Sequence, residues 1–240
     1  MDYYRTNEEI DEIGEGLIRK YQYQTFIQGK STDIEDFIVN FLGYRIIYDK
    51  LAEKDTGKMA FLADGKGSLW LWRNGIRVFV TPPARTIIVD EFLRQEANIK
   101  KRRFALAHEA GHIIMSKLGN NPIVSAFRNE FDREQEYSIK DLASMFSIGE
   151  SMATSMGVAL LMPKTSVIYR IKGITNGKKI PLYGNSVLYD HDRNIVGKAA
   201  EHFLVSYKSM FYRLRDLKLF ELRELDEYIA DSLGDLGGTI

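Results

Sequence analysis

Residues 104–115, FALAHEAGHIIM, constrain the fold more than any other stretch of this chain. His108 and His112 are four positions apart, so on an α-helix their imidazoles lie on one face and can bind one metal ion. Glu109 is turned by about 100° from His108, because the helix has 3.6 residues per turn. Its carboxylate can therefore approach a water molecule at the metal without being a ligand. The pattern predicts a catalytic zinc helix.

An ordinary helix that contains these three residues by chance is the alternative. The chain has only four histidines, and a random His-Glu-x-x-His spacing arises in fewer than about one in a hundred such sequences. The surrounding residues are apolar enough for the helix to be buried. Two histidines and a glutamate are costly to bury without an ion or hydrogen-bonding partners. The cost of burial therefore favours a metal site.

The chain has no cysteine, so a third metal ligand has to be a carboxylate or one of the other two histidines, His191 and His202. A catalytic zinc binds three protein ligands and keeps its fourth position for water. Glu150 is the strongest candidate, because small residues follow it on the same face of a predicted helix. The alternative is that Glu150 is exposed on the surface, as most glutamates are.

The small residues on both helices predict a close helix contact. Three of them follow Glu150 on its own face, and two more lie on the motif helix: Ala153, Thr154, Gly157, Ala110 and Gly111. Side chains of this size let the two helices approach closely, which would bring Glu150 to the histidines. The other faces of the second helix carry apolar residues that we expect in the core: Met145, Met152, Met156, Leu160 and Leu161.

The segments RRFALAHEAGHIIM and ESMATSMGVALLMP together resemble the ImmA/IrrE-type metallopeptidases. That family has an R-F-x-L-A-H-E-x-G-H helix followed by an E-x-x-A-N-x-F-A-x-x-L-L-M-P helix. The residues that match the two patterns are Arg103, Phe104, Leu106, Ala107, His108, Glu109, Gly111, His112, Glu150, Ala153, Leu160, Leu161, Met162 and Pro163. The resemblance implies a zincin-like fold, one zinc ion on His108, His112 and Glu150, and Glu109 as the general base.

This chain departs from the family pattern at three positions of the second helix. Thr154 stands in place of asparagine, Met156 in place of phenylalanine and Gly157 in place of alanine. None of these changes removes a ligand or the base. They bear on the hydrogen bond that an asparagine would make behind the metal ligands. The resemblance also implies a protein substrate, of the class of phage or mobile-element repressors and stress-response transcriptional regulators.

The sequence predicts an α+β fold with a small, mostly antiparallel sheet. Capping boxes at Thr6 and at Thr32 predict two amphipathic helices before the sheet. Five β-rich runs follow between residues 44 and 92, and Asn74-Gly75 predicts a tight hairpin turn between two of them. The motif helix is predicted over residues 97–118. The second ligand helix is predicted over 139–162, because Pro163 disfavours helix at the residue before it.

We expect a metallopeptidase domain over residues 1–165 and a mainly helical region over 166–240. Within 166–240, residues 178–194 predict a hairpin or an extended excursion, and the rest predicts helices. Residues 196–220 predict two short helices around Val205-Ser206, a layout that resembles a helix-turn-helix.

Charges near this helix pair give little support for DNA binding. Six basic and four acidic residues occur over 196–224, a net charge of plus two. Packing against the peptidase or a partner is therefore favoured over contact with DNA. Asp190-His191-Asp192 is interpreted as a polar turn rather than a second metal site, and the acidic residues 129–137 as a solvated loop.

Composition excludes several other classes of protein. Lysine plus arginine and aspartate plus glutamate both number 33, so no net charge attracts nucleic acid or an anionic membrane. The absence of cysteine excludes disulfides and thiolate zinc sites. The first residues lack the layout of a signal peptide, and no apolar run is long enough to span a bilayer. We therefore expect a soluble, cytoplasmic protein.

These patterns favour a zinc-dependent endopeptidase in which Glu109 accepts the proton of the attacking water and passes it to the leaving amine. The alternative is a DNA-binding or regulatory protein in which zinc is structural. Structural zinc sites usually have four protein ligands, and only three are convincing here. A latent peptidase that needs a signal or a partner is a third possibility.

Overall fold

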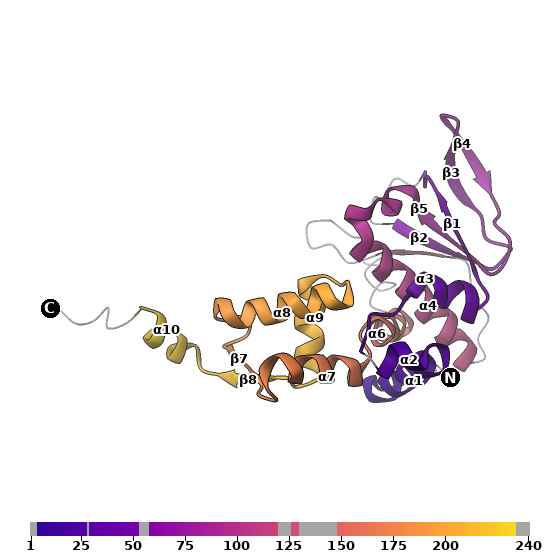
Figure 1. Ribbon diagram of the computed structural model, residues 1–240. Helices are drawn as coiled ribbons and strands as arrows, with labels where there is room; N and C mark the ends of the chain where they lie inside the picture. Colours follow the sequence, from indigo (N-terminus) through magenta and orange to yellow (C-terminus); the bar gives the residue numbers. More distant parts are fainter. Residues whose placement is uncertain (1–3, 28, 53–57, 120–125, 130–147, 234–240) are drawn as a thin grey trace.

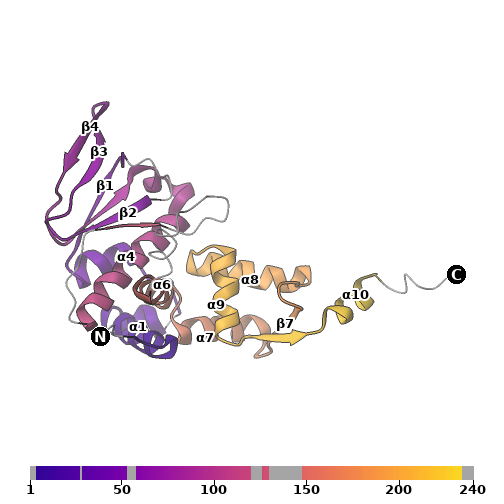
Figure 2. The ribbon, with the colours of Figure 1, turned by 180° about the vertical axis from the view of Figure 1, so that it is seen from behind.

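The computed structural model describes residues 4–27, 29–52, 58–119, 126–129 and 148–233. It has an α+β architecture in which a group of helices lies beneath a small sheet, and an elongated C-terminal part extends from the helices (Figure 1). The same arrangement is visible from behind (Figure 2). Within the described residues, no helix is both long enough and apolar enough to cross a membrane.

The helices and strands below are those of the described residues, in chain order. The helices are α1 (Asn7–Tyr21), α2 (Tyr23–Ile27), α3 (Ile34–Asp36), α4 (Ile99–Gly119), α6 (Ile148–Leu161), α7 (Lys164–Thr175), α8 (Asp190–Phe203), α9 (Tyr207–Asp216) and α10 (Leu225–Leu233). A π-helical segment, η1 (Phe37–Phe41), and two 3₁₀ turns, η2 (Glu91–Arg94) and η3 (Glu96–Asn98), complete the helical part. The strands are β1 (Arg45–Asp49), β2 (Lys58–Ala63), β3 (Leu69–Arg73), β4 (Ile76–Val80), β5 (Thr86–Asp90), β6 (Ala126–Asn129), β7 (Ile180–Tyr183) and β8 (Phe220–Arg223).

The main sheet has the strand order β1-β5-β2-β6. Among its pairings, β5 with β2 and β2 with β6 are antiparallel, whereas β1 with β5 is parallel. Alternate residues of the central strands point to opposite faces. Leu62 and Ile87 contribute to the core shared with the helices, whereas Phe61 and Ile88 pack with Leu71 of the hairpin. The sheet therefore lies between α4 and the β3–β4 hairpin.

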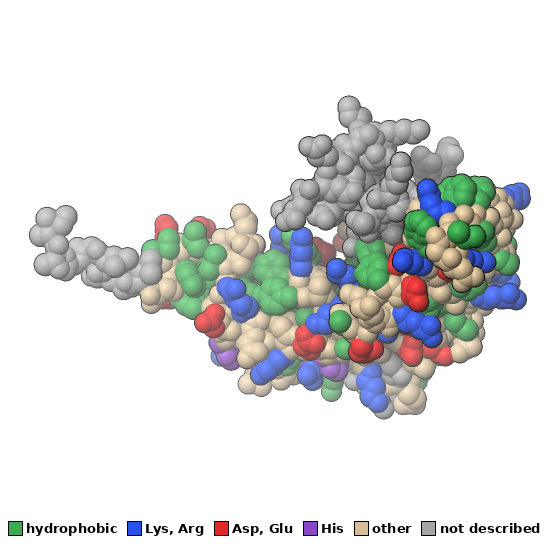
Figure 3. All heavy atoms as spheres, turned by 90° about the horizontal axis from the view of Figure 1, so that it is seen from above, with side chains coloured by type: hydrophobic (Ala, Val, Ile, Leu, Met, Phe, Trp, Pro, Cys, Tyr) green, Lys and Arg blue, Asp and Glu red, His purple; other side chains and the backbone are tan. Residues whose placement is uncertain are grey.

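The β3–β4 hairpin confirms the turn predicted at Asn74-Gly75. Both residues have positive φ, 52° and 79°, which is the geometry of a two-residue hairpin turn that asparagine and glycine adopt readily. One face of the hairpin is buried. The other face exposes large side chains, and Figure 3 shows hydrophobic and basic groups together in this region. The exposed residues of that face are Trp70, Trp72, Arg77 and Phe79, and residues 73–76 are exposed at the turn end of the hairpin.

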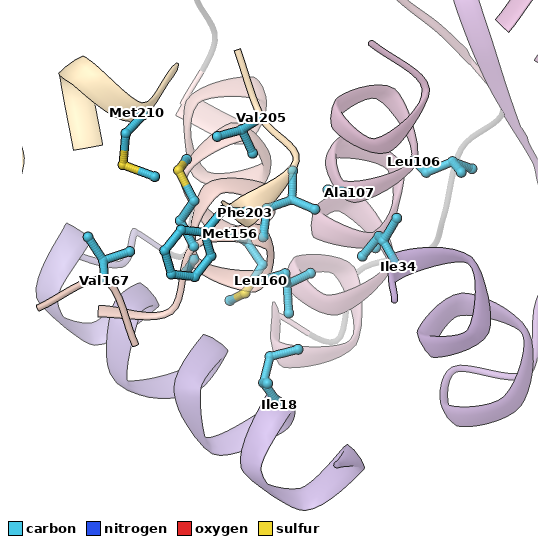
Figure 4. Close-up of a cluster of buried hydrophobic side chains, with 14 of the residues drawn as sticks. Ile18, Ile34, Leu106, Ala107, Met156, Leu160, Val167, Phe203, Val205 and Met210 are labelled. Carbon is cyan, nitrogen blue, oxygen red and sulfur yellow. The ribbon is translucent and has the colours of Figure 1, made fainter. Parts of the chain in front are cut away.

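The main hydrophobic core joins the N-terminal helices, α4 and α6, and the C-terminal helices. Figure 4 shows side chains from these helices converging around α6, including Ile18, Leu160, Phe203 and Met210. All four are at most 2% exposed. The core thus spans the predicted boundary at residue 165, and the division into two domains stays a prediction.

Arg213 on α9 links the C-terminal helices to α1 and to the end of α6. Its guanidinium is almost fully buried and forms an ion pair with Asp11 of α1, at 2.6 Å between nitrogen and oxygen. It also donates to the carbonyl oxygen of Met162, directly after α6, at 2.9 Å. This arginine therefore packs against the body of the protein, and it is not available to contact a phosphate backbone.

The predicted second helix begins differently from the expected capping box. Asp33 is its N-cap, and the Asp33 side chain accepts the backbone N–H of Asp36. Thr32 is buried instead, and its hydroxyl donates to the carbonyl oxygen of Leu160 at 2.8 Å. The Thr32 hydroxyl, which the sequence pattern predicted as the helix cap, thus forms a tertiary hydrogen bond instead. The first capping box, Thr6 with Glu9, is confirmed.

Two predictions for the C-terminal region are wrong. Residues 190–192 form the first turn of α8 rather than a polar turn, and acidic side chains there stabilise the positive end of the helix. Residues 220–223 form a strand rather than a helix, and this strand pairs in parallel with β7. The expected hairpin or extended excursion is therefore β7 and the turn after it. The acidic residues 130–137 and the predicted helix start at 139–147, with Met145, lie outside the described residues.

Candidate metal centre

The two ligand helices approach each other as closely as their small residues allow. A Cβ atom added at Gly111 of α4 would lie 2.2 Å from the carbonyl oxygen of Ala153 on α6. A Cβ at Gly157 would lie 3.0 Å from the backbone of Ala107. The contact at Gly111 leaves no room for a side chain, and the contact at Gly157 is tighter than an ordinary van der Waals contact. The predicted close packing of α4 and α6 is therefore confirmed, and it rests on glycine backbone.

This approach brings His108, His112 and Glu150 together. The Nε2 atoms of the two histidines are 3.0 Å apart. Glu150 Oε2 lies 3.2 Å from the Nε2 atom of His108 and 3.3 Å from that of His112. The three side chains are only 12–15% exposed. Among the described residues, no other group of three histidine or carboxylate side chains is spaced to hold a metal ion.

The distances between these three donor atoms fit a tetrahedral ion. Bonds of about 2.0–2.1 Å at tetrahedral angles place neighbouring donor atoms about 3.3 Å apart. The three measured separations, 3.0, 3.2 and 3.3 Å, lie close to this value. Two imidazole nitrogens and one carboxylate oxygen are also donor types that zinc accepts. The residues therefore fit a zinc ion in both chemistry and spacing.

Hydrogen bonds alone do not account for this triangle of atoms. A neutral imidazole Nε2 either carries a proton or offers a lone pair, and an ionised carboxylate only accepts. If both histidines carry a proton on Nε2, the contact between His108 and His112 joins two donors. If one of them does not, its contact with Glu150 joins two acceptors. A cation shared by all three atoms removes the conflict.

Thr154 supplies a polar partner on the far side of His108. Its hydroxyl oxygen lies 3.2 Å from the Nδ1 atom of the His108 ring. When Nδ1 carries the proton and donates it to this oxygen, Nε2 keeps its lone pair and can bind a metal. Threonine therefore occupies the place where the family pattern has asparagine and offers the same kind of contact. From the sequence, Thr154 was identified as one of the small residues after Glu150 and as a departure from the family pattern, and its contact with His108 was not predicted.

Glu109 is almost fully buried on α4, at 1% exposed, although it directly follows His108 in the sequence. Arg103, one turn and a half earlier on α4, is also buried. Its guanidinium donates to the carbonyl oxygens of Phe203 and Leu204, at the negative end of α8. Burial lowers the pKa of Arg103 below its ordinary value. These contacts hold the motif helix against the C-terminal helices.

The other two histidines lie away from this group. His202 contacts the carbonyl oxygen of Gly29 through Nε2, at 2.7 Å. His191 is exposed in the first turn of α8. Burial raises the pKa of its neighbour Asp192. Of the third-ligand candidates considered from the sequence, Glu150 is the one that the structure brings to His108 and His112.

Comparison with known families agrees with this geometry. Residues 42–215 match the family of the IrrE N-terminal-like domain, Peptidase M78, and this range is well over half of the chain. The protein therefore belongs to that family. The match confirms the resemblance seen in the two helix motifs. A search of curated proteins found no match.

Proposed function

We propose that this protein is a zinc-dependent endopeptidase, with His108, His112 and Glu150 as metal ligands and Glu109 as the general base. The observation that carries the proposal is the convergence of three donor atoms within 3.0–3.3 Å of one another in a member of a metallopeptidase family. With three protein ligands, a tetrahedral ion keeps one position open, as a catalytic site requires.

The metal and the protein residues have separate roles in peptide hydrolysis. Bound zinc supplies Lewis acidity, which polarises a carbonyl group and lowers the pKa of water. Glu109 accepts a proton from the attacking water at its carboxylate and releases it to the leaving amine. Thr154 keeps the His108 ring in the tautomer that leaves Nε2 unprotonated. The close packing of α4 and α6 fixes the positions of the ligands before substrate binds.

The proposed substrate is a protein, of the class of phage or mobile-element repressors and stress-response regulators. This part of the proposal is supported by the resemblance to the ImmA/IrrE-type peptidases and by membership of the family. We place the protein in the cytoplasm on the same ground, because such regulators act there.

The second candidate is a DNA-binding or regulatory protein with a structural zinc, acting through residues 196–224. The contacts of α9 count against it. Of the basic residues predicted on this helix, Arg213 is buried in its ion pair with Asp11. That leaves Lys208 and Arg215 exposed on α9, which is few for a helix that binds a phosphate backbone.

The substitution Glu109→Gln tests the proposed function most directly. We expect it to retain zinc and to abolish cleavage, because glutamine is similar in shape but cannot accept the proton. The measurements are elemental analysis of the purified protein and a comparison of new protein N-termini in cells that express the wild type or the variant. Glu12→Gln, the same change at an exposed position of α1, is the matched control.

Each outcome separates the two candidates. New N-termini that appear with the wild type and with Glu12→Gln, but not with Glu109→Gln, support the peptidase. The same new N-termini with all three proteins would show that Glu109 is not the base. If expression of the wild type yields none, and the zinc-loaded protein binds duplex DNA in a salt-sensitive way, the regulatory alternative is favoured.

A further inference from the structure

The C-terminal part of the chain contains a sheet of only two strands, β7 and β8, which lies far from the main sheet (Figure 1). Within the described residues, β8 pairs with β7 on one edge and with no other strand on the opposite edge. A two-stranded sheet is marginally stable by itself, and a free strand edge is a template for pairing with another chain. The outer edge of β8 is therefore a candidate site for pairing with a strand of another chain.

The backbone of β8 has its hydrogen-bonding groups in the right positions to pair outward. The carbonyl oxygens of Leu219 and Arg223 accept N–H groups from residues 180 and 184. Successive residues of a strand turn their N–H and C=O groups to opposite edges. Phe220, Leu222 and Glu224 therefore turn theirs away from β7. Two residues of β8, Phe220 and Leu222, thus offer donors and acceptors to a further strand, and Glu224 offers its N–H, because its carbonyl oxygen already accepts from Glu227.

The side chains of β8 are complementary to those of a second β8 strand. If two copies pair in antiparallel fashion with residue 222 opposite residue 222, Glu221 of each copy lies opposite Arg223 of the other. Two opposite-charge pairs then flank a central pair of leucines. Glu221 and Arg223 already form a surface ion pair within one strand, at 3.0 Å. Antiparallel pairing would extend this pair into a network of four alternating charges, which is favourable across strands.

Exposed apolar side chains lie next to the same edge. Leu222 is 72% exposed at its centre, and Leu225 and Ile229 of α10 are 42% and 44% exposed. Figure 3 shows hydrophobic side chains gathered on α10 at this end of the molecule. Antiparallel pairing places residue 224 opposite residue 220 of the second copy, so α10 begins beside the other chain. A specific dimer buries about 1,200–2,000 Å², and α10 adds area that two short strands lack.

We infer that this protein forms a homodimer through antiparallel pairing of β8 with β8 of a second copy, which makes a continuous four-stranded sheet β7-β8-β8-β7. The inference rests on the unpaired edge, the self-complementary charges and the exposed apolar residues beside them. It is independent of the metal site and of the proposed peptidase activity.

Charge substitutions in the full chain test this pairing. Glu221→Arg places like charges opposite Arg223 of the other copy, and Arg223→Glu places like charges opposite Glu221. We expect each substitution to raise the dissociation constant of the dimer by about tenfold or more, because it acts twice in a symmetric interface. Sedimentation velocity over a range of protein concentrations measures this constant. Glu12→Arg, on α1 at the other end of the molecule, is the matched control.

Mixing the two variants provides the decisive measurement. A chain with Glu221→Arg and a chain with Arg223→Glu are complementary to each other, so their mixture should form heterodimers although each alone is mainly monomeric. The double variant, Glu221→Arg with Arg223→Glu, should dimerise like the wild type. Circular dichroism of each variant checks that the fold is retained.

Three results would overturn the inference. The wild type could remain monomeric at every concentration. The dimer could be insensitive to both single substitutions, which would direct attention to the exposed aromatic face of the β3–β4 hairpin. The mixture could remain as monomeric as its components, which would show that Glu221 and Arg223 do not face each other across the interface.

Discussion

Two regions of this chain differ in how tightly they pack. One is the contact between α4 and α6, and the other is the arm formed by β7, β8 and α10. In the helix pair, glycines at positions 111 and 157 let backbone approach backbone closely: a Cβ atom would lie 2.2 Å from the nearest backbone atom at position 111 and 3.0 Å at position 157. In the arm, a two-stranded sheet and a short helix leave Leu222, Leu225 and Ile229 exposed. The first region can hold side chains in fixed positions. The second has surface to offer to another molecule.

This difference in packing indicates where the fold should tolerate amino-acid substitutions. A site that binds an ion with three side chains needs positions fixed to about half an ångström, and the glycine contact between α4 and α6 supplies that rigidity. An exposed strand edge needs only its backbone and its pattern of charges. Substitutions should therefore have large effects in the helix pair and small effects on the stability of the arm.

The largest effect is expected for Gly111→Ala. The added Cβ would lie 2.2 Å from Ala153 O, and both atoms belong to packed helices that cannot yield without separating. We expect the free energy of unfolding to fall by about 3 kcal/mol or more, at or above the upper end for overpacked cores. Chemical denaturation measures the change, and zinc binding should weaken with it.

The matched control is Gly173→Ala on α7, where a Cβ would meet no atom within 4 Å. Alanine favours a helix over glycine by about 1 kcal/mol, so this variant should be as stable as the wild type or slightly more stable. If both glycine variants behaved alike, the close approach of α4 and α6 would not be what limits position 111.

An intermediate effect is expected for Thr154→Val, which removes the hydroxyl near His108 Nδ1 and keeps the shape of the side chain. Loss of such a partner of a metal ligand typically weakens metal affinity by about 10- to 100-fold. Competition with a chelating dye measures the affinity, and Thr154→Ser, which keeps the hydroxyl, should bind zinc nearly as the wild type does. Equal affinity for the valine variant would exclude the positioning role of Thr154.

The smallest effect is expected in the arm. Ile229→Val should change the free energy of unfolding by less than about 0.5 kcal/mol, because this side chain is 44% exposed. The same change at Ile18, which is 2% exposed in the core, should cost about 1 kcal/mol. Both are measured at a protein concentration low enough to keep the chain monomeric. A loss at Ile229 as large as at Ile18 would mean that α10 is covered in the folded monomer.

The sequence predicted those features in which local pattern and tertiary role agree. The motif helix was expected over 97–118 and is observed over Ile99–Gly119. The face of small residues after Glu150 packs closely on α4. It could be predicted because glycine and alanine in a helix indicate where another backbone approaches. The turn at Asn74-Gly75 is local and was predicted for the same reason.

Features that depend on distant contacts escaped prediction. Thr32 matches the capping-box pattern better than Asp33 does, yet the Thr32 hydroxyl donates to the carbonyl oxygen of Leu160, 128 residues away, and Asp33 caps the helix. Residues 220–223 read as part of a charged helical tail, and only pairing with β7 makes them a strand. The partner of His108 Nδ1 was not foreseen, because which atom faces a ring nitrogen depends on how two helices are rotated about their axes.

The ion pair between Arg213 and Asp11 also has a consequence for how the protein is made. These residues are 202 positions apart, and the same guanidinium binds the carbonyl oxygen directly after α6. A chain leaving the ribosome exposes Asp11 and the whole of α6 before Arg213 has been synthesised. The nascent protein therefore contains α4 and α6 before it contains the residue that joins the end of α6 to α1. We expect the packing of α6 against α1 to be completed only in the last part of translation.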